Sequence, residues 1–239
     1  MSQPPTYSML LTERARLSDE ACEDCVIKLS LEPMDGQRVH HFIAGQYVRL
    51  GIPRASEPAP AYFAMASSPY HQQGYEFVIK SSQGMSETLA TLPLGSEIAV
   101  EGPIGKGFDL NQHRGKHVIL LGVGTGIAPL RSLWGQIIKE REHFQEVSIY
   151  AGFLTAMHQL LTEEINELSK HQVNTSVSLT TGHEQWAGPV GYVQHALAAD
   201  APSPENTVVC LAGMSAMVDA CTETLHDLGF QDDQILLNF

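Results

Sequence analysis

A glycine-rich turn between an apolar strand and a helix is the segment of this sequence best suited to chemistry. The apolar run 118–121 predicts a buried parallel strand, and Gly124, Thr125 and Gly126 follow it closely. Glycines at such a junction let backbone N–H groups approach a diphosphate, and the helix N-terminus adds the positive end of its dipole. Pro129 falls in the first turn of that helix, where its missing N–H costs little. The turn predicts a nucleotide phosphate site, and an ordinary tight strand-to-helix turn is the alternative.

Four cysteines and eleven histidines raise the question of a metal or redox site. Cys22 and Cys25 have the spacing of a metal-binding pair, but no second pair accompanies them, because ten residues separate Cys210 from Cys221. A structural zinc or iron–sulfur site normally takes four ligands. We therefore predict no metal site and place Cys22 and Cys25 at the start of a strand, with a redox pair as the alternative.

The composition is that of a globular protein rather than a disordered one. The 239 residues are 43% hydrophobic and 17% charged. The net charge of −13 disfavours nucleic acid and anionic membranes as partners, and it would repel an acidic plant-type ferredoxin. No apolar run reaches the roughly 20 residues of a membrane span, and the N-terminus lacks the features of a signal peptide. We expect no membrane span and a cytoplasmic location.

The first half of the chain has the pattern of an antiparallel sheet. Short β-type segments alternate with Gly and Pro turns, and they predict strands at 25–31, 46–50, 62–66, 76–81 and 97–100. One short helix is predicted over 85–91, with Ser86 as its N-cap.

The second half alternates strands with helices, which predicts βαβ units and a parallel sheet covered on both faces. The predicted strands are 117–121, 147–151, 175–180 and 207–212, and the predicted helices are 128–142, 160–170, 193–198 and 214–228. The segment 111–115 is the natural linker, which gives two predicted domains, 1–112 and 113–239.

The order Gly124-Thr125-Gly126-Ile127-Ala128-Pro129-Leu130-Arg131 resembles the nicotinamide-binding loop of the ferredoxin–NADP reductase superfamily. The two-part layout resembles that superfamily as well. The resemblance implies an antiparallel, Greek-key β-barrel that binds FAD, followed by an α/β parallel-sheet domain that binds NAD(P). The stretch 105–108 is most similar to the electron-transfer subunit of dihydroorotate dehydrogenase, without the cysteine-rich cluster segment of that subunit.

In this superfamily a strand of the pattern Arg-x-Tyr-Ser-x-x-Ser holds the flavin, and the stretch from Ala61 aligns with it. The resemblance implies flavin contacts from five residues of that stretch: Tyr62, Phe63, Ala64, Met65 and Ser67. Ala61 replaces the arginine that pairs with the FAD diphosphate, a charge-assisted contact worth about 1.5–3 kcal/mol. Ala64 replaces the serine that hydrogen-bonds the flavin ring. We therefore expect weaker FAD binding than in relatives that keep the full motif.

A second flavin segment follows at Gly84, Met85 and Ser86, which is similar to the family's Gly-x-Ser/Thr segment. Backbone N–H groups at the start of the short helix, with the Ser86 hydroxyl, would meet a diphosphate. Because FMN has no diphosphate, this segment implies FAD. A plain helix cap at Ser86 is the alternative.

The nicotinamide side of the family pattern is matched by Gly152, Gly213 and Met214. Ala212 stands where relatives carry a cysteine beside the nicotinamide. Leu154 and Thr181 stand where NADPH-selective relatives carry arginine, which reads a 2′-phosphate through its planar fork. The resemblance therefore implies NAD(P)H as the electron donor, with NADH favoured.

The last residue, Phe239, matches a terminal aromatic that stacks on the flavin and gates nicotinamide entry in many relatives. Packing between the domains is the alternative. The whole pattern implies an oxidoreductase that passes a hydride from NADH to FAD and electrons to an unknown acceptor, which could be a protein. The competing interpretation is a non-catalytic member that binds a nucleotide as a regulatory subunit.

Overall fold

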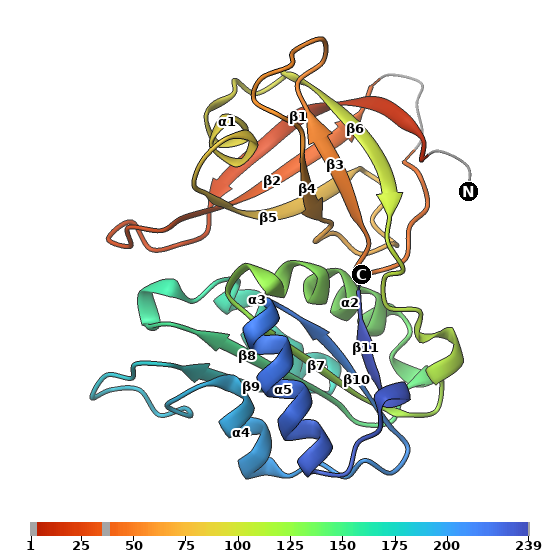
Figure 1. Cartoon of the computed structure of the whole chain (residues 1–239), viewed down its shortest axis with the longest axis vertical. Helices are drawn as coiled ribbons and strands as arrows, with labels where there is room; N and C mark the ends of the chain where they lie inside the picture. The colour runs from red at the N-terminus through yellow and green to blue at the C-terminus, as the bar shows by residue number, and fades with distance from the viewer. Residues whose placement is uncertain (1–3, 35–38, 239) are drawn as a thin grey trace.

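The chain forms two sheets that lie one above the other (Figure 1). The structure is a computed structural model, and it describes residues 4–34 and 39–238. The first half builds a six-stranded antiparallel sheet, and the second half builds a five-stranded parallel sheet. The predicted fold class is confirmed.

The antiparallel sheet curls into a half-barrel around its own core. Its strands are β1 (Thr6–Arg16), β2 (Cys25–Pro33), β3 (Tyr47–Gly51), β4 (Ala61–Ala64), β5 (Tyr75–Ser81) and β6 (Glu97–Ile104), in the order β4-β3-β6-β1-β2-β5. Side chains that alternate along each strand fill the interior, as a period of two requires. Leu29, Val48, Leu50 and Phe77 of this core are fully buried.

The short helix α1 (Met85–Thr91) occupies the predicted range, but the predicted cap at Ser86 is wrong. The N-cap residue is Gly84, whose positive φ of 63° suits glycine, and no side chain caps the helix. The Ser86 hydroxyl accepts a hydrogen bond from the Ser82 N–H at 3.2 Å and donates one to the Gln83 carbonyl at 3.0 Å.

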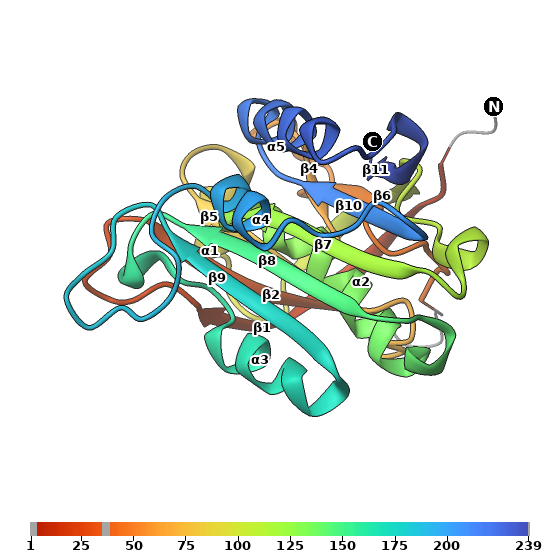
Figure 2. The same ribbon diagram turned by 90° about the horizontal axis from the view of Figure 1, so that it is seen from below.

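The parallel sheet contains β7 (His117–Val123), β8 (Val147–Phe153), β9 (Val173–Leu179), β10 (Thr207–Ala212) and β11 (Ile235–Leu237), in the order β11-β10-β7-β8-β9. Four helices cover it: α2 (Ile127–Lys139), α3 (Thr162–Glu167), α4 (Val193–Asp200) and α5 (Ser215–Asp227). Leu120 faces the core shared with α2 and α3, whereas Leu121 faces the core shared with α4 and α5. The helices therefore cover both faces, as Figure 2 shows from below and as the alternation predicted.

Several element ends differ from the predictions. Strands β1 and β11 were not predicted, because β1 carries several charged residues and β11 is only three residues long. The strand predicted to reach residue 66 ends at Ala64, and the helix predicted from residue 160 begins at Thr162. The predicted linker includes part of a 3₁₀ turn at Leu110–His113, inside which the proposed domain boundary falls.

One arginine joins the two halves of the chain. Arg131, on the face of α2 toward the half-barrel, donates to the Glu76 carboxylate of β5 at 2.7 Å and to the Ala66 carbonyl at 3.0 Å. Its guanidinium also binds Glu164 of α3 through two hydrogen bonds, at 2.7 and 3.1 Å. Arg131 and Glu76 are both largely buried. Burial alone would raise the pKa of Glu76, but Arg131, together with Lys28 and His71, outweighs burial and holds that pKa below its ordinary value, so the carboxylate stays charged.

We predict that Arg131→Met lowers the free energy of unfolding by about 3 kcal/mol, because the buried Glu76 carboxylate then keeps only the Lys28 ammonium, 3.6 Å away, as a charged partner. Glu164→Gln serves as the control. Its carboxylate is 40% exposed, so its loss costs about 1 kcal/mol or less. Urea unfolding of the parent and of both variants measures the two losses of unfolding free energy. Equal losses would contradict the conclusion that Arg131 holds the two halves together.

Candidate nucleotide site

A large cavity lies at the carboxyl ends of the parallel strands, between the two halves of the chain. Its volume is about 1030 Å³. The chain leaves β7 toward β8 and β9 on one side and returns to β10 on the other, so the strand order switches direction between β10 and β7. Open α/β sheets bind ligands in the crevice at such a switch point.

The glycine turn forms the floor of this cavity. Residues Gly124–Gly126 make a single 3₁₀ turn between β7 and α2. A Cβ on Gly126 would lie 2.7 Å from the Ala212 carbonyl oxygen, so only glycine lets this turn sit against the end of β10. Gly124 has a φ of 51°, and no atom lies within 4 Å of the place its Cβ would take. The turn is packed tightly on the sheet side and open on the cavity side.

The part of the cavity beside the half-barrel is lined by small residues from both halves. Ala64, at the end of β4, faces the same space as Pro129, Ala212 and Gly213. Together with the glycine turn, these small residues define the part of the cavity that we call the slot.

The outer rim of the cavity is apolar and exposed. Leu154 follows β8, Tyr192 precedes α4, and Met214 precedes α5, and each exposes more than half of its surface. Thr180 lies among them at the end of β9. The half-barrel contributes Asp24 and Lys80 to the opposite wall.

The structure brings about half of the predicted site residues together. Those that line the cavity are Ala64, Gly124, Thr125, Gly126, Pro129, Gly152, Gly213 and Met214. Met65, Ser67 and Met85 lie elsewhere: Met65 and Met85 are buried in the half-barrel core, and the buried Ser67 hydroxyl accepts a hydrogen bond from the Glu76 N–H. Phe63, which partly packs against that core, pairs with the buried Val48 across the sheet.

Tyr62 and the α1 segment lie outside the cavity lining. Tyr62 is 62% exposed and packs edge-on against Tyr47, with ring centroids 5.6 Å apart. Gly84 is exposed at the start of α1. The Ser86 hydroxyl is engaged by the turn that precedes this helix.

The prediction for Phe239 falls outside the described residues. The preceding residue, Asn238, lines the cavity, and its side-chain amide donates to the Gly45 carbonyl at 3.0 Å. Asn238, directly after β11, is thereby held against the half-barrel.

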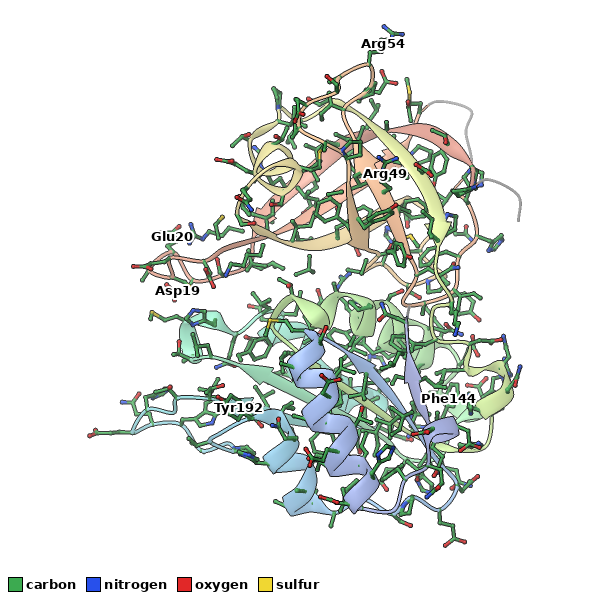
Figure 3. The ribbon with its side chains drawn as sticks, in the orientation of Figure 1. Asp19, Glu20, Arg49, Arg54, Phe144 and Tyr192 are labelled. Carbon is green, nitrogen blue, oxygen red and sulfur yellow. The ribbon has the colours of Figure 1, made fainter. Side chains whose placement is uncertain are left out.

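Sequence reasoning missed the contribution of the β1–β2 loop and of Lys80. Ser18, Cys22 and Asp24 of this loop line the cavity together with Lys80. Figure 3 shows Asp19 and Glu20 at the loop tip, on the side where the loops after β8 and β9 also project. Cys22 and Cys25 are free cysteines. Within the described residues, no group of three or more His, Cys, Asp or Glu side chains could hold a metal ion.

Two family models match the chain, one over each half. The model of the oxidoreductase FAD-binding domain matches residues 10–108, and that of the oxidoreductase NAD-binding domain matches residues 120–223. The chain therefore belongs to the ferredoxin–NADP reductase superfamily, and FAD and a nicotinamide nucleotide are its cofactors.

Curated relatives are similar over most of this chain. Fruit protein pKIWI502 of Actinidia deliciosa is 30% identical over 89% of the chain and 70% of its own length. NADH-cytochrome b5 reductase 1 of Dictyostelium discoideum is 28% identical over 80% of the chain and 68% of its own length. Sulfhydrogenase 1 subunit gamma of Pyrococcus furiosus is 25% identical over 82% of the chain and 67% of its own length.

Solved structures share the fold. A ferredoxin NADP⁺ reductase from Neisseria gonorrhoeae with bound FAD and NADP superposes with a TM-score of 0.78, at 21% identity, over 97% of each chain. The CS–b5R domains of human Ncb5or superpose with a TM-score of 0.85 at 16% identity, over the whole of this chain and 70% of that one. Among the described residues, no helix is both long and apolar enough to cross a membrane.

The cavity leaves room for a nucleotide phosphate beside the glycine turn. No atom lies within 4 Å of the place that a Cβ on Gly124 would take, so a phosphate can approach the backbone there. The apolar rim around Leu154 and Tyr192 suits the planar base and ribose of an adenosine.

We predict that Gly126→Ala weakens nucleotide binding and costs about 1–3 kcal/mol of stability, because the new methyl group must push the turn away from β10. Gly95→Ala is the control. Its φ of 85° disfavours alanine, so this variant also loses stability, but Gly95 lies in the half-barrel with open space around it. Its NAD⁺ affinity should therefore stay at the parent value. Calorimetric titration with NAD⁺ and urea unfolding measure the two effects, and unchanged NAD⁺ affinity in Gly126→Ala would contradict the role of the turn.

Proposed function

We propose that the chain is an FAD-dependent oxidoreductase that uses NADH as electron donor, and that its reaction takes place in the slot between Ala64 and the glycine turn. One observation carries this proposal: the end of β4, which belongs to the FAD-binding half, and the turn after β7, which belongs to the NAD-binding half, line the same cavity. When bound, FAD supplies the redox chemistry, because its ring accepts a hydride from a reduced nicotinamide and passes electrons onward.

The residues of the chain have distinct roles in this proposal. The backbone of Gly124–Gly126 and the N-terminus of α2 bind the nucleotide diphosphate. Ala212 and Gly213 border the nicotinamide, and Ala64, with the neighbouring Tyr62 and Phe63, borders the flavin. Met65, Ser67 and Met85 support this part of the half-barrel from behind, and Gly84 with Ser86 remains the proposed segment for the FAD diphosphate.

The cavity rim around Leu154 and Thr180, where we place the adenosine of the nucleotide, favours NADH over NADPH. Leu154 is exposed at the rim, and Thr181 is exposed just beyond the cavity-lining Thr180, so neither place offers the cation that a 2′-phosphate requires. The net charge of −13 disfavours the additional phosphate as well.

The alanines that replace family motif residues also agree with a second function, that of a non-catalytic nucleotide-binding member. A member that binds a nucleotide but transfers no hydride would also carry alanine at 61, 64 and 212. A purified protein with the yellow flavin spectrum, from which acid releases FAD, supports the reductase. A colourless protein that rejects added FAD supports the non-catalytic member.

The proposal also covers how the electron acceptor reaches the site. We infer an acceptor that reaches the edge of the slot from solvent, where Asn238 and the exposed Met214 line the cavity. A protein acceptor would have to be neutral or basic at its contact surface, given the acidic balance of this chain.

We predict that Leu154→Arg improves flavin reduction by NADPH at limiting concentration about tenfold, since a guanidinium at the rim can bind the 2′-phosphate. Leu154→Gln, which adds a polar group without charge, is the control and leaves NADPH use unchanged. The rate of flavin bleaching at several concentrations of each nucleotide measures the effect. A parent protein that uses NADPH at lower concentration than NADH would contradict the proposed preference.

A further inference from the structure

A largely buried carboxylate at the end of α2 accepts hydrogen bonds from three different parts of the chain. Glu140 is the C-cap residue of α2, and its side chain is only 11% exposed. The Tyr70 hydroxyl donates to its Oε1 at 2.6 Å, and the Gln136 amide donates to the same oxygen at 3.1 Å. The Arg114 guanidinium donates to Oε2 at 3.1 Å. Both oxygens of the carboxylate are therefore engaged.

These partners connect the two halves of the chain and the segment between them. Tyr70 lies in the loop between β4 and β5 of the half-barrel, and Arg114 lies in the predicted linker. The backbone binds the linker to the same region, because the Gly115 N–H donates to the His143 carbonyl at 2.7 Å. Glu140 thus joins the half-barrel, the linker and the NAD-binding half at one point.

Tyr70 is held in place by its hydroxyl more than by burial of its ring. The residue is 51% exposed, so apolar packing contributes less to its position than it does for a core tyrosine. The hydrogen bond to Glu140 raises the pKa of Tyr70, so the hydroxyl keeps its proton and remains a donor at neutral pH. The Tyr70 N–H donates to the Ser68 hydroxyl at 3.2 Å, which couples the tyrosine to the shape of its own loop.

The loop that carries Tyr70 begins directly after the slot. Ala64 ends β4 and lines the cavity, and the chain then runs through Ser68 to Tyr70. Ser68 packs on α2, because a Cβ on Gly135 would lie only 2.9 Å from the Ser68 Cβ. The hydrogen bond of Tyr70 therefore acts on a segment that leads from the flavin side of the slot onto α2.

Glu140 forms a second joint between the halves, at a distance from Arg131. The two residues are nine apart in the chain, which corresponds to about 13 Å along a helix. A single joint leaves two rigid bodies free to rotate about it, whereas two separated joints restrict that rotation. The two joints together therefore restrict the orientation of the half-barrel on α2 as well as its distance.

We propose that Tyr70 and Glu140 are positioning residues for hydride transfer, because their hydrogen bond orients the half-barrel on α2 and so aligns the two sides of the slot. This inference rests on the proposed function. Neither residue belongs to the cavity lining, so both act through the orientation of the two halves and not through contact with a nucleotide. Hydride transfer is sensitive to that orientation, since the reacting atoms have to approach to about 3–3.5 Å.

The test measures flavin reduction in a single turnover at saturating NADH, on FAD-loaded parent and Tyr70→Phe. The rate should fall about fivefold in the variant, because the slot is less well aligned. The affinities for NAD⁺ and FAD, measured by calorimetry and flavin fluorescence, should stay within twofold of the parent. This split between rate and affinity is what separates alignment from binding.

Tyr150→Phe is the matched control. The Tyr150 hydroxyl also donates to a carboxylate, that of Asp200 at 2.9 Å, but both residues lie in the NAD-binding half and outside the lining of the nucleotide cavity. The control should lose a similar amount of stability in urea unfolding and keep the parent rate of flavin reduction.

A double-mutant cycle identifies the partner of Tyr70. Glu140→Ala should slow flavin reduction at least as much as Tyr70→Phe does, and Tyr70→Phe should have little further effect in that background. Glu140→Gln keeps an oxygen that accepts the hydrogen bond from Tyr70, so it should retain more of the rate than Glu140→Ala.

Three results would overturn the inference. Tyr70→Phe could reduce its flavin within twofold of the parent rate, or Tyr150→Phe could slow it equally, and either result rejects the positioning role while the proposed function stands. Equal losses from Tyr70→Phe with and without Glu140→Ala would reject Glu140 as the partner. A parent whose bound flavin is not reduced by NADH would reject the proposed function and this inference together.

Discussion

The guanidinium of Arg131 lies where three parts of the chain meet, and it binds a carboxylate of β5, a carbonyl beyond β4 and a carboxylate of α3. The same helix that carries Arg131 begins at the glycine turn. One rigid element therefore carries the glycine turn at its N-terminus and contacts the half-barrel along its side. Because the Ala66 carbonyl lies only two residues beyond Ala64, the contacts of Arg131 help to set the spacing across the slot.

A second constraint acts from the sheet side. Gly126 packs so closely against the end of β10 that a methyl group would not fit, and Gly135 of α2 approaches Ser68 of the half-barrel with similar closeness. The helix is thus held between the two halves by contacts that tolerate little movement. The core beneath it continues into the half-barrel through Ala44, Ala66 and Phe108. The two halves are therefore joined by packing as well as by charge.

The features that the sequence predicted well are local ones. The β7 strand, the turn after it and helix α1 are each encoded by neighbouring residues, so their positions could be derived without knowledge of the fold. Strands β1 and β11 escaped prediction because pairing with distant strands, rather than their own composition, makes them strands. The same reason explains why the sequence did not predict two ion pairs, that of Arg131 with Glu76 and that of Lys80 with Asp24. Each pair unites residues that are far apart in the chain, and no short motif signals such a contact.

In the proposed function, the slot between Ala64 and the glycine turn brings the nicotinamide to the flavin, and every other proposed role depends on this. Anaerobic mixing of the FAD-loaded protein with NADH, and with NADH carrying deuterium at C4, tests it in a stopped-flow spectrophotometer. We expect the visible flavin band to bleach in a single turnover, more slowly with the deuterated nucleotide. A protein that binds both FAD and NADH while its flavin band stays unchanged would contradict this role of the slot.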